Sequence, residues 1–260
     1  MIHQLLVGAS PGDAVTNAAL GLRELLRRIG PSDVFAHYIE PELAGLGYDD
    51  GAVWPLPLDP AAWLAVEPDG PTADRLAAEA DRPVVLFVGQ VLPHKRVDLL
   101  LSSMCVLQTA LVPEARLAVV GPARNARYGA AIEALAREQH LEVTFTGRVS
   151  DAELAAWYRG AAAFATMSEH EGIGIPLLEA MAHGLPVVAR SWAAIPETLA
   201  GAGLALPADA GPLLVAEALA HVLGDEGTRK LLIDGGRARV AALDADAARA
   251  DFLRHLGALL

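Results

Sequence analysis

The sequence is poor in cysteine, in aromatic residues and in positive charge. Its 260 residues contain one cysteine, Cys105, so an intramolecular disulfide is impossible, which agrees with a reducing compartment. Cys105 lies in an apolar run, and we expect it to pack rather than to react. Lys and Arg number 20 against 32 Asp and Glu, which gives a formal charge of −12 without a basic cluster. Binding of a nucleic acid through a basic face is therefore not expected.

Long uncharged apolar runs are also missing. No run reaches the roughly 18 residues that a membrane-spanning helix needs, and the N-terminus lacks the cationic start and long apolar core of a signal peptide. We therefore expect a cytoplasmic protein without a transmembrane segment. What the sequence does contain is apolar material, because 53% of its residues are hydrophobic and 20% are charged. This is enough for one large core or two small ones.

The first 80 residues differ in pattern from the rest. A strand is expected over residues 5–8, a helix over 14–29 and a second strand over 33–38, which together make a βαβ-like start. Residues 41–83 hold seven of the 17 prolines, and proline lacks the donor that helices and central strands need. This stretch is interpreted as a connector, with one short helix near residues 72–80.

From residue 82 onward, short apolar or β-branched runs alternate with helical ones. The alternation predicts right-handed crossovers and a mostly parallel sheet covered by helices on both faces. We therefore divide the chain into residues 1–80 and a second domain of residues 81–260. Strands are expected at residues 83–88, 116–120, 142–146, 162–165, 186–189 and 203–206. Helices are expected at residues 97–111, 128–140, 151–159, 176–183, 211–223, 227–243 and 245–259. Ligands of such sheets bind where the strand order reverses, at the carboxyl ends of the strands, which directs attention to the loops after residues 88, 120, 146 and 165.

A glycine-containing loop before a helix is the most informative part of the sequence. From Thr166 to Ala189 the order is strand end, glycine loop, helix with Pro176 in its first turn, glycine stop and strand. Gly172 and Gly174 allow the backbone to come close to a ligand. The free amides at the start of the following helix attract an anion.

Two carboxylates belong to this segment, Glu171 in the loop and Glu179 about one turn into the helix. Carboxylates beside a phosphate site repel the phosphate unless they face another group. Sugar hydroxyls are suitable partners, because they donate charge-assisted hydrogen bonds to a carboxylate. Alternatively, Glu171 stabilises the helix start electrostatically and Glu179 is solvated. The carboxylate pair alone leaves these interpretations even.

One lysine follows the strand that ends at Val88. Lys95 would lie on the same sheet edge as Glu171, in a domain otherwise poor in cations. A cation there could neutralise the charge on a departing diphosphate. For an isolated loop lysine, however, the residues alone favour a solvated surface charge.

Taken together, these segments resemble the carboxyl-terminal donor-binding domain of the family 4 glycosyltransferases, which are retaining enzymes of the two-domain GT-B fold. The matching stretches are residues 86–95, 146–154 and 168–189, the last with the family's Glu-x7-Glu spacing. The resemblance covers residues 82–245 approximately. It implies a Rossmann-like doubly wound parallel α/β sheet as donor domain, joined to a truncated second α/β lobe on the acceptor side.

The resemblance also implies roles for individual residues. Glu171 is expected to contact the hydroxyls of the donor sugar, Glu179 the ribose and Lys95 the diphosphate. Glu171 and Lys95 are the expected catalytic residues, although Glu171 need not act as a base. No metal and no cofactor are expected. The other expected donor-binding residues are Gln90, Val149, which borders the base, His170, which adjoins Glu171, and the loop residues Gly172, Ile173 and Gly174.

Two departures from the family pattern affect the expected activity. Gln90 replaces an arginine that also holds the diphosphate. A neutral amide forms hydrogen bonds of about 0.5–1.5 kcal/mol against about 1.5–3 for a charged group, so the loss is about tenfold unless Arg124 and Arg127 compensate. In addition, a Rossmann-like acceptor domain takes on the order of 150 residues, whereas only residues 1–80 precede the donor domain. The segment with the family's amino-domain histidine is therefore expected to be missing, and His37 is interpreted as having a structural or surface role.

Two functions therefore stay open at this stage. The first is a retaining glycosyltransferase that moves a sugar from a nucleoside-diphosphate donor to a hydroxyl acceptor. The second is a nucleotide-sugar-binding module with weak or no transfer activity. The expected partners are the nucleotide sugar and an unknown hydroxyl acceptor, and a homo-oligomer that completes the cleft is a further possibility.

Overall fold

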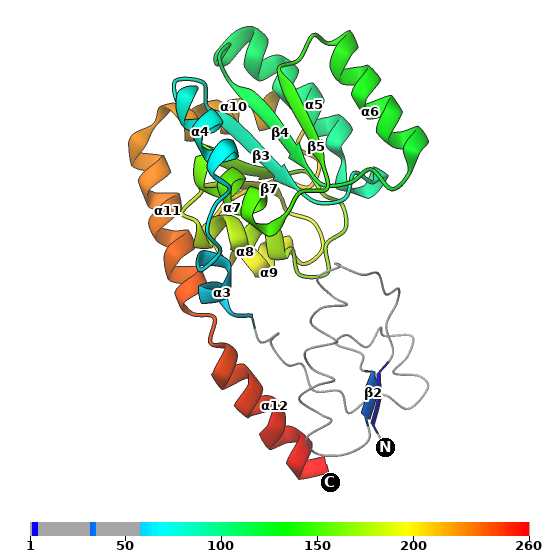
Figure 1. Cartoon of the computed structure of the whole chain (residues 1–260), viewed down its shortest axis with the longest axis vertical. Coiled ribbons are helices and arrows are strands. Elements are labelled where there is room, and N and C mark those ends of the chain that lie inside the picture. The colour runs from blue at the N-terminus through cyan, green and yellow to red at the C-terminus, as the bar shows by residue number, and fades with distance from the viewer. Residues whose placement is uncertain (1, 5–31, 35–57, 260) are drawn as a thin grey trace. The chain divides into compact units, whose positions relative to one another are not determined.

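The computed structural model describes residues 2–4, 32–34 and 58–259 (Figure 1). The chain divides into two compact units. One unit is Pro60–Ala242, and the other combines Met1–Asp59 with Leu243–Leu260.

In the second of these units, two short strands and one helix are described. Strands β1 (Ile2–Gln4) and β2 (Ser32–Val34) pair in parallel, as a βαβ-like start requires. Helix α12 (Ala245–Leu259) has the expected bounds. The strand expected at residues 5–8, the helix expected at 14–29, the end of the second strand, His37 and most of the connector lie outside the described residues.

The larger unit is built around a six-stranded sheet in which every neighbouring pair is parallel. The strand order is β5-β4-β3-β6-β7-β8, so the direction of winding reverses between β3 and β6. The parallel sheet agrees with the alternating pattern, and its doubly wound order is the one that the family resemblance implies. The strands are β3 (Val84–Val88), β4 (Arg116–Val120), β5 (Val143–Gly147), β6 (Ala163–Thr166), β7 (Val187–Arg190) and β8 (Leu204–Leu206).

Helices cover both faces of this sheet. Helices α5, α6 and α10 lie on one face and share a core with the central strands, whereas α7 and α8 lie on the other face (Figure 1). The helices are α3 (Pro60–Leu64), α4 (Gly70–Ala78), α5 (Val97–Val106), α6 (Ala126–Glu138), α7 (Asp151–Gly160), α8 (Ile175–Ala182), α9 (Ile195–Leu199), α10 (Pro212–Gly224) and α11 (Glu226–Ala241).

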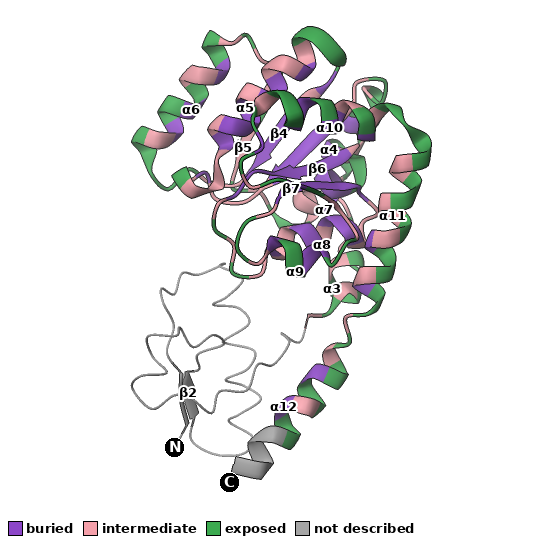
Figure 2. Cartoon of the chain, turned by 180° about the vertical axis from the view of Figure 1, so that it is seen from behind, coloured by how far each residue is buried: buried purple, intermediate pink, exposed green. Residues whose placement is uncertain are grey.

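The core explains the composition of the central strands. All residues of β6 and β7 are buried, as are nearly all of β3 and β4. Parallel strands covered on both faces need continuous apolar runs rather than alternating ones. Buried residues gather on the sheet and on the helix faces that meet it (Figure 2). Within the described residues, no helix combines the length and apolar character that crossing a bilayer takes.

The helix expected over residues 97–111 changes type near its end. Helix α5 stops at Val106, and Leu107–Leu111 form a π-helical turn. In this turn the Gln108 side chain exchanges two hydrogen bonds of 3.1 Å with the backbone of Glu142, just before β5. The wider turn thus accompanies the attachment of the helix end to the edge strand.

Residues 60–80 belong to the sheet unit, which begins at Pro60. Helix α4 packs on α7 of the sheet unit. The Asp69 amide donates to the Ala152 carbonyl at 2.9 Å, and the Arg75 guanidinium lies 5.2 Å from the centre of the Trp157 ring. The prolines at the start of α3 and α4 begin helices rather than interrupt them.

Candidate functional site

The candidate site lies at the carboxyl edge of the sheet, where the order reverses between β3 and β6. Two loops meet there, β3–α5 and β6–α8. The Glu169 amide donates to the His94 carbonyl at 2.8 Å and so joins the loops directly. Ser168 is fully buried, and its hydroxyl donates to the His170 carbonyl at 3.0 Å. The backbone of both loops is therefore fixed beside the switch point.

The Lys95 ammonium is held by the carboxylate of Glu171. Lys95 ends a one-turn 3₁₀ helix, Pro93–Lys95, that precedes α5. Its Nζ donates to Glu171 Oε1 at 2.7 Å, and the side chains are 18% and 13% exposed, respectively. Lys95 is thus not the solvated surface charge that the residues alone favoured. The fold brings a cation and an acid, which are 76 residues apart, to one point of the sheet edge.

The loop that carries Glu171 leads directly into α8. Gly174 is the N-cap of this helix in the left-handed region, with φ 72° and ψ 47°, and no side chain caps the helix. The Ile173 carbonyl accepts from the Thr198 hydroxyl on α9. No described residue accepts a hydrogen bond from the backbone amides of Gly172, Ile173 or Gly174. The loop therefore offers amide donors beside the Lys95–Glu171 pair, an arrangement suited to an anion.

Glu179 lies one turn into α8 and is not solvated. Its Oε2 accepts a hydrogen bond from the Tyr158 hydroxyl on α7 at 2.8 Å. Burial raises the pKa of the Glu179 carboxyl, the Tyr158 hydrogen bond opposes the rise, and the charge of Asp151 adds to it. The alternative of a solvated Glu179 is therefore wrong. Among the described residues no hydrogen bond or ion pair links Glu179 to Lys95 or Glu171, so the two acids have separate partners.

A group of charged residues that the sequence pattern did not indicate supports the β6–α8 loop. The Glu169 carboxylate accepts a hydrogen bond from Arg96 and lies 3.6 Å from Nη1 of Arg190, which is buried at the end of β7. Arg96 also pairs with Asp98 at 3.1 Å. The hydrogen bonds that Arg96 donates to Asp98 and Glu169 raise its pKa above the ordinary value. No local spacing indicates this group, because its members come from three different loops and strands.

Replacing Glu169 by glutamine is expected to lower the free energy of unfolding by roughly 1–3 kcal/mol. The buried Arg190 then loses its counter-charge, and an uncompensated buried charge is costly, although the 36% exposure of Glu169 moderates the effect. Urea unfolding measures the change. The matched control is Asp246→Asn, which breaks an exposed pair with Arg249 and should cost about 0–1 kcal/mol. Equal costs for both variants would contradict a supporting role for Glu169.

The remaining predicted site residues lie on the same sheet edge. His170 is exposed, and its ring meets that of His94 edge to face at 6.0 Å. Burial, with the nearby charge of Lys95, lowers the pKa of His94. Gln90 follows β3 and Val149 precedes Ser150, the N-cap of α7, and both are half-buried. The loops after β3, β4 and β5 adjoin, because the Gly89 amide donates to the Val120 carbonyl and the Gly121 amide to the Gly147 carbonyl.

Sequence reasoning missed Tyr158, which donates a hydrogen bond to Glu179, and His183, whose ring stacks on that of Tyr158. The tyrosine occurs among the buried residues Ala155, Ala156 and Trp157 of α7. A tyrosine on such an apolar helix face needs a partner for its hydroxyl, and this need was the available signal. The sequence did not show which acceptor the fold supplies.

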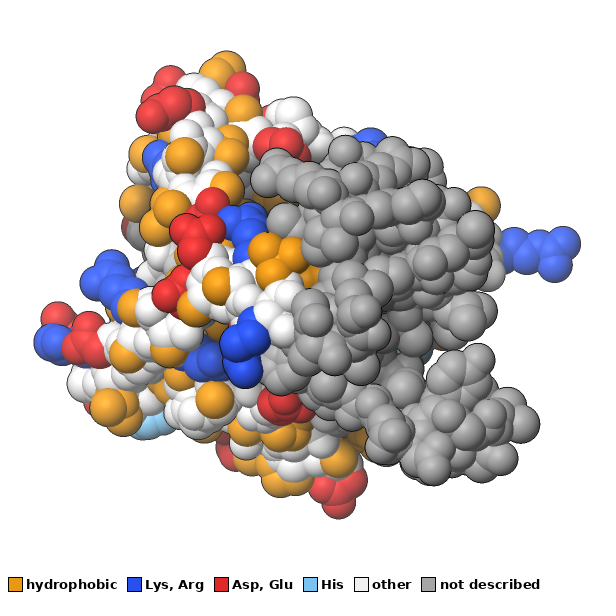
Figure 3. Space-filling model, turned by 90° about the horizontal axis from the view of Figure 1, so that it is seen from below, with side chains coloured by type: hydrophobic (Ala, Val, Ile, Leu, Met, Phe, Trp, Pro, Cys, Tyr) orange, Lys and Arg blue, Asp and Glu red, His pale blue; other side chains and the backbone are white. Residues whose placement is uncertain are grey.

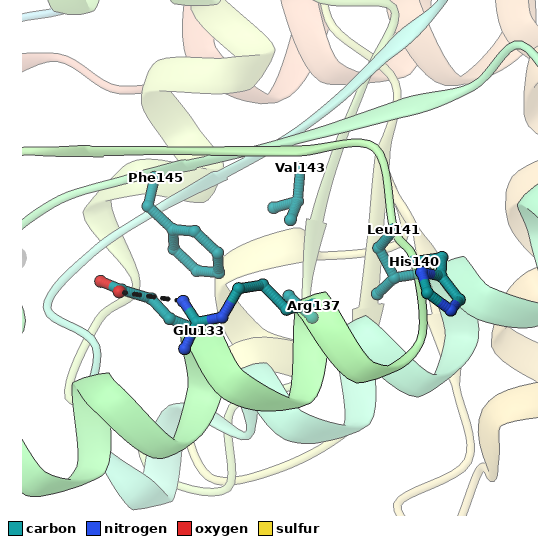
Figure 4. Close-up of a pocket in the computed structure, with 7 residues that line it drawn as sticks. Glu133, Arg137, His140, Leu141, Val143 and Phe145 are labelled. Carbon is teal, nitrogen blue, oxygen red and sulfur yellow. Dashed lines mark ion pairs between the residues drawn. The ribbon is translucent and has the colours of Figure 1, made fainter.

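A separate hollow of about 370 Å³ lies between α6 and β5 (Figure 4). It is lined by Glu133, Ala136, Arg137, His140, Leu141, Val143 and Phe145 and contains none of the predicted site residues. In the described part of the chain, no three His, Cys, Asp or Glu side chains are grouped as a metal site would require. On the face shown in Figure 3, the acidic and basic side chains that are described are interspersed rather than gathered by sign.

Solved structures share this fold. The structure of HepE from Anabaena in complex with UDP and glucose aligns over 99% of this chain and 71% of its own, with a TM-score of 0.70 and 16% identity. The carboxyl-terminal domain of a glycosyl transferase group 1 protein (LpcC) from Francisella tularensis aligns over 69% of this chain and 95% of its own, with a TM-score of 0.56 and 19% identity. At these identities the likeness shows the GT-B type of fold alone.

Two curated sequence relatives are more similar to this chain than these solved structures are. A D-inositol 3-phosphate glycosyltransferase of Xylanimonas cellulosilytica is 32% identical over 203 residues, which cover 76% of this chain and 46% of the relative. A GDP-mannose-dependent alpha-(1-6)-phosphatidylinositol monomannoside mannosyltransferase of Mycobacterium tuberculosis is 33% identical over 222 residues, covering 75% and 57%. The chain thus spans about half the length of these curated relatives. Residues 82–225, more than half of the chain, match the family described as glycosyl transferases group 1. The chain therefore belongs to the glycosyl transferases group 1 family.

Proposed function

We propose that this protein is a glycosyltransferase that binds a nucleoside-diphosphate sugar at the β3/β6 switch point and transfers the sugar to a hydroxyl acceptor with retention. The observation that carries the proposal is the Lys95–Glu171 pair beside the amides that open α8. Both residues lie inside the stretch that matches the family. The names of the relatives and neighbours, which mention GDP-mannose and UDP with glucose, agree with a donor of this class.

The pair has to open when the donor binds. Lys95 exchanges the carboxylate of Glu171 for oxygens of the diphosphate, because a phosphate carries more negative charge than one carboxylate. The amides of Gly172, Ile173 and Gly174 share in holding the diphosphate and the sugar. Glu171 is then free to accept hydrogen bonds from hydroxyls of the sugar. The same two side chains thus neutralise each other without a donor and divide the diphosphate and the sugar between them with one.

We assign the nucleoside end of the donor to Glu179. The Glu179 carboxylate accepts hydrogen bonds from the ribose hydroxyls, and Val149 borders the base, in line with the family resemblance. Gln90 contributes an uncharged hydrogen bond to the diphosphate, and His170 lies beside the sugar. The proposed site assigns no residue to a metal ion.

The transfer step follows from this placement. The bond between the anomeric carbon and the diphosphate oxygen breaks, and its electron pair stays on that oxygen. The acceptor oxygen bonds to the anomeric carbon on the same face, and the acceptor proton passes to the leaving diphosphate. Lys95 and the loop amides stabilise the charge that develops on the diphosphate. Glu171 positions the sugar and need not accept a proton.

Addition of UDP or GDP is expected to raise the melting temperature of the chain, because a ligand of the folded state stabilises it by about 2.7 kcal/mol at a hundred times its Kd. Incubation with UDP-glucose or GDP-mannose should then release the matching diphosphate slowly, with water as acceptor. Thermal shift and diphosphate release can be measured without knowledge of the acceptor. Absence of any shift with UDP, GDP and ADP at millimolar concentration would overturn the proposed site.

A further inference from the structure

Among the described residues, Tyr158 is the one whose side chain donates a hydrogen bond to Glu179. The Tyr158 side chain is fully buried and stacks with two rings, that of Phe164 at 6.4 Å and 27° and that of His183 at 5.2 Å and 7°. The near-parallel stacking on His183 fixes the plane of the phenol ring. The hydroxyl donates to Glu179 Oε2 at 2.8 Å, and the Pro176 carbonyl is farther away at 3.4 Å.

This contact leaves the two carboxylate oxygens of Glu179 unequal. Oε2 is occupied by Tyr158, whereas no described residue donates to Oε1. Burial raises the pKa of the Tyr158 hydroxyl well above its ordinary value, so the group stays protonated and always donates. Because the ring is fully buried and stacks on His183, its freedom to follow a moving acid is restricted. The carboxylate is thereby held in one orientation, with one oxygen available.

We propose that Tyr158 is a positioning residue for the nucleoside of the donor: its hydroxyl holds the Glu179 carboxylate so that the free oxygen accepts from the ribose hydroxyls. The inference rests on the proposed function and deepens it. It adds α7 to the donor site, although Tyr158 itself does not touch the ligand. His183 serves as the stacking platform for the ring.

Loss of the hydroxyl should make nucleotide binding sensitive to pH. The charged groups around Glu179 are Asp151 on α7, which raises its pKa, and, beyond Tyr158, His183 and Arg159. The Tyr158 hydrogen bond is the contact that lowers the pKa of Glu179. Its removal raises that pKa further, so Glu179 becomes protonated at a higher pH than in the unchanged protein. A protonated acid accepts hydrogen bonds from a ribose diol less well, so affinity in the variant should fall earlier as pH is lowered.

The test compares the Kd of GDP and UDP for the full chain and for Tyr158→Phe by calorimetry, between about pH 5 and about pH 8. We expect about tenfold weaker binding in the variant at pH 6 and a smaller difference at pH 8. The matching 2′-deoxynucleoside diphosphates lack one ribose hydroxyl and serve as the control ligands. Their affinity should change less than that of the ribonucleotides, which a general structural defect would not produce.

A double variant keeps the test decisive if Tyr158→Phe also lowers stability. Glu179→Ala removes the carboxylate that accepts the Tyr158 hydrogen bond, so adding Tyr158→Phe to it should change GDP affinity by less than twofold, the result that non-additive partners give. Equal affinity of the unchanged chain and Tyr158→Phe at every pH would overturn this inference and leave the proposed function standing. Failure of the unchanged chain to bind either diphosphate would instead refute the proposed function, and the inference with it.

Discussion

Replacing Lys95 by glutamine is expected to weaken the binding of UDP or GDP by about 10- to 150-fold, the equivalent of about 1.5–3 kcal/mol for hydrogen bonds to a charged group. Two effects act in the same direction. The diphosphate loses its cation, and Glu171, with 13% of its side chain exposed, is left as an unpaired negative charge beside the phosphates. Calorimetric Kd values measure the loss.

The sequence supplies a matched control for this prediction. Lys230 on α11 is the one other lysine of the chain, is 75% exposed and pairs with Asp234 four residues away. Lys230→Gln changes the net charge by the same amount and should leave the Kd within about twofold. The double variant Lys95→Gln/Glu171→Gln removes the unpaired acid, so it should regain part of the affinity for the diphosphate. If Lys95→Gln and Lys230→Gln bind alike, Lys95 does not hold the diphosphate.

Replacing Gly121 by alanine is expected to lower the free energy of unfolding by about 2–5 kcal/mol. The residue has φ +137°, and a Cβ atom there would lie 2.0 Å from the carbonyl oxygen of Gly89. The strained backbone costs about 1–2 kcal/mol, and the forced displacement of a neighbouring main chain adds about 1–3 kcal/mol. The expected effect is large because the loops after β3 and β4 approach each other at the sheet edge, and the obstacle is backbone rather than a flexible side chain.

Gly147 provides the comparison. It too has a positive φ, +66°, but a Cβ atom there would meet nothing within 4 Å. Gly147→Ala should therefore cost only the backbone strain of about 1–2 kcal/mol. Urea unfolding of both variants separates the two contributions. A Gly121→Ala protein with the midpoint of Gly147→Ala would show that the approach of the loops is not as close as the structure has it.

Much of the fold could be predicted from local patterns. The apolar runs of β3, β4, β6 and β7 and the helical runs between them were sufficient to indicate a doubly wound sheet. Composition misled within the expected connector, because Pro60 and Pro71 begin helices α3 and α4 there rather than interrupt them. The π-helical turn at Leu107–Leu111 was also missed, since its pattern does not differ from that of a continuing helix.

The candidate site was predictable only in its parts. The Glu-x7-Glu spacing and the glycines of the β6–α8 loop are local and can be recognised in the sequence, as can a lysine before α5. That Lys95 lies against Glu171 follows from the order of the strands, which places β3 beside β6 although 76 residues separate the two side chains. The sequence alone favoured a solvated lysine, because Lys95 is an isolated loop lysine and the acid that pairs with it is 76 residues away in the chain.

Apolar period and turn chemistry act over a few residues, so they indicated the strands, most of the helices and the chemical types of the groups at the sheet edge. Which groups meet depended on the fold, which pairs Lys95 with Glu171, Tyr158 with Glu179, and Glu169 with Arg96 and Arg190. A buried charge or hydroxyl is costly unless it is paired or hydrogen-bonded, and the path of the chain determines which partner is near enough to pair with it.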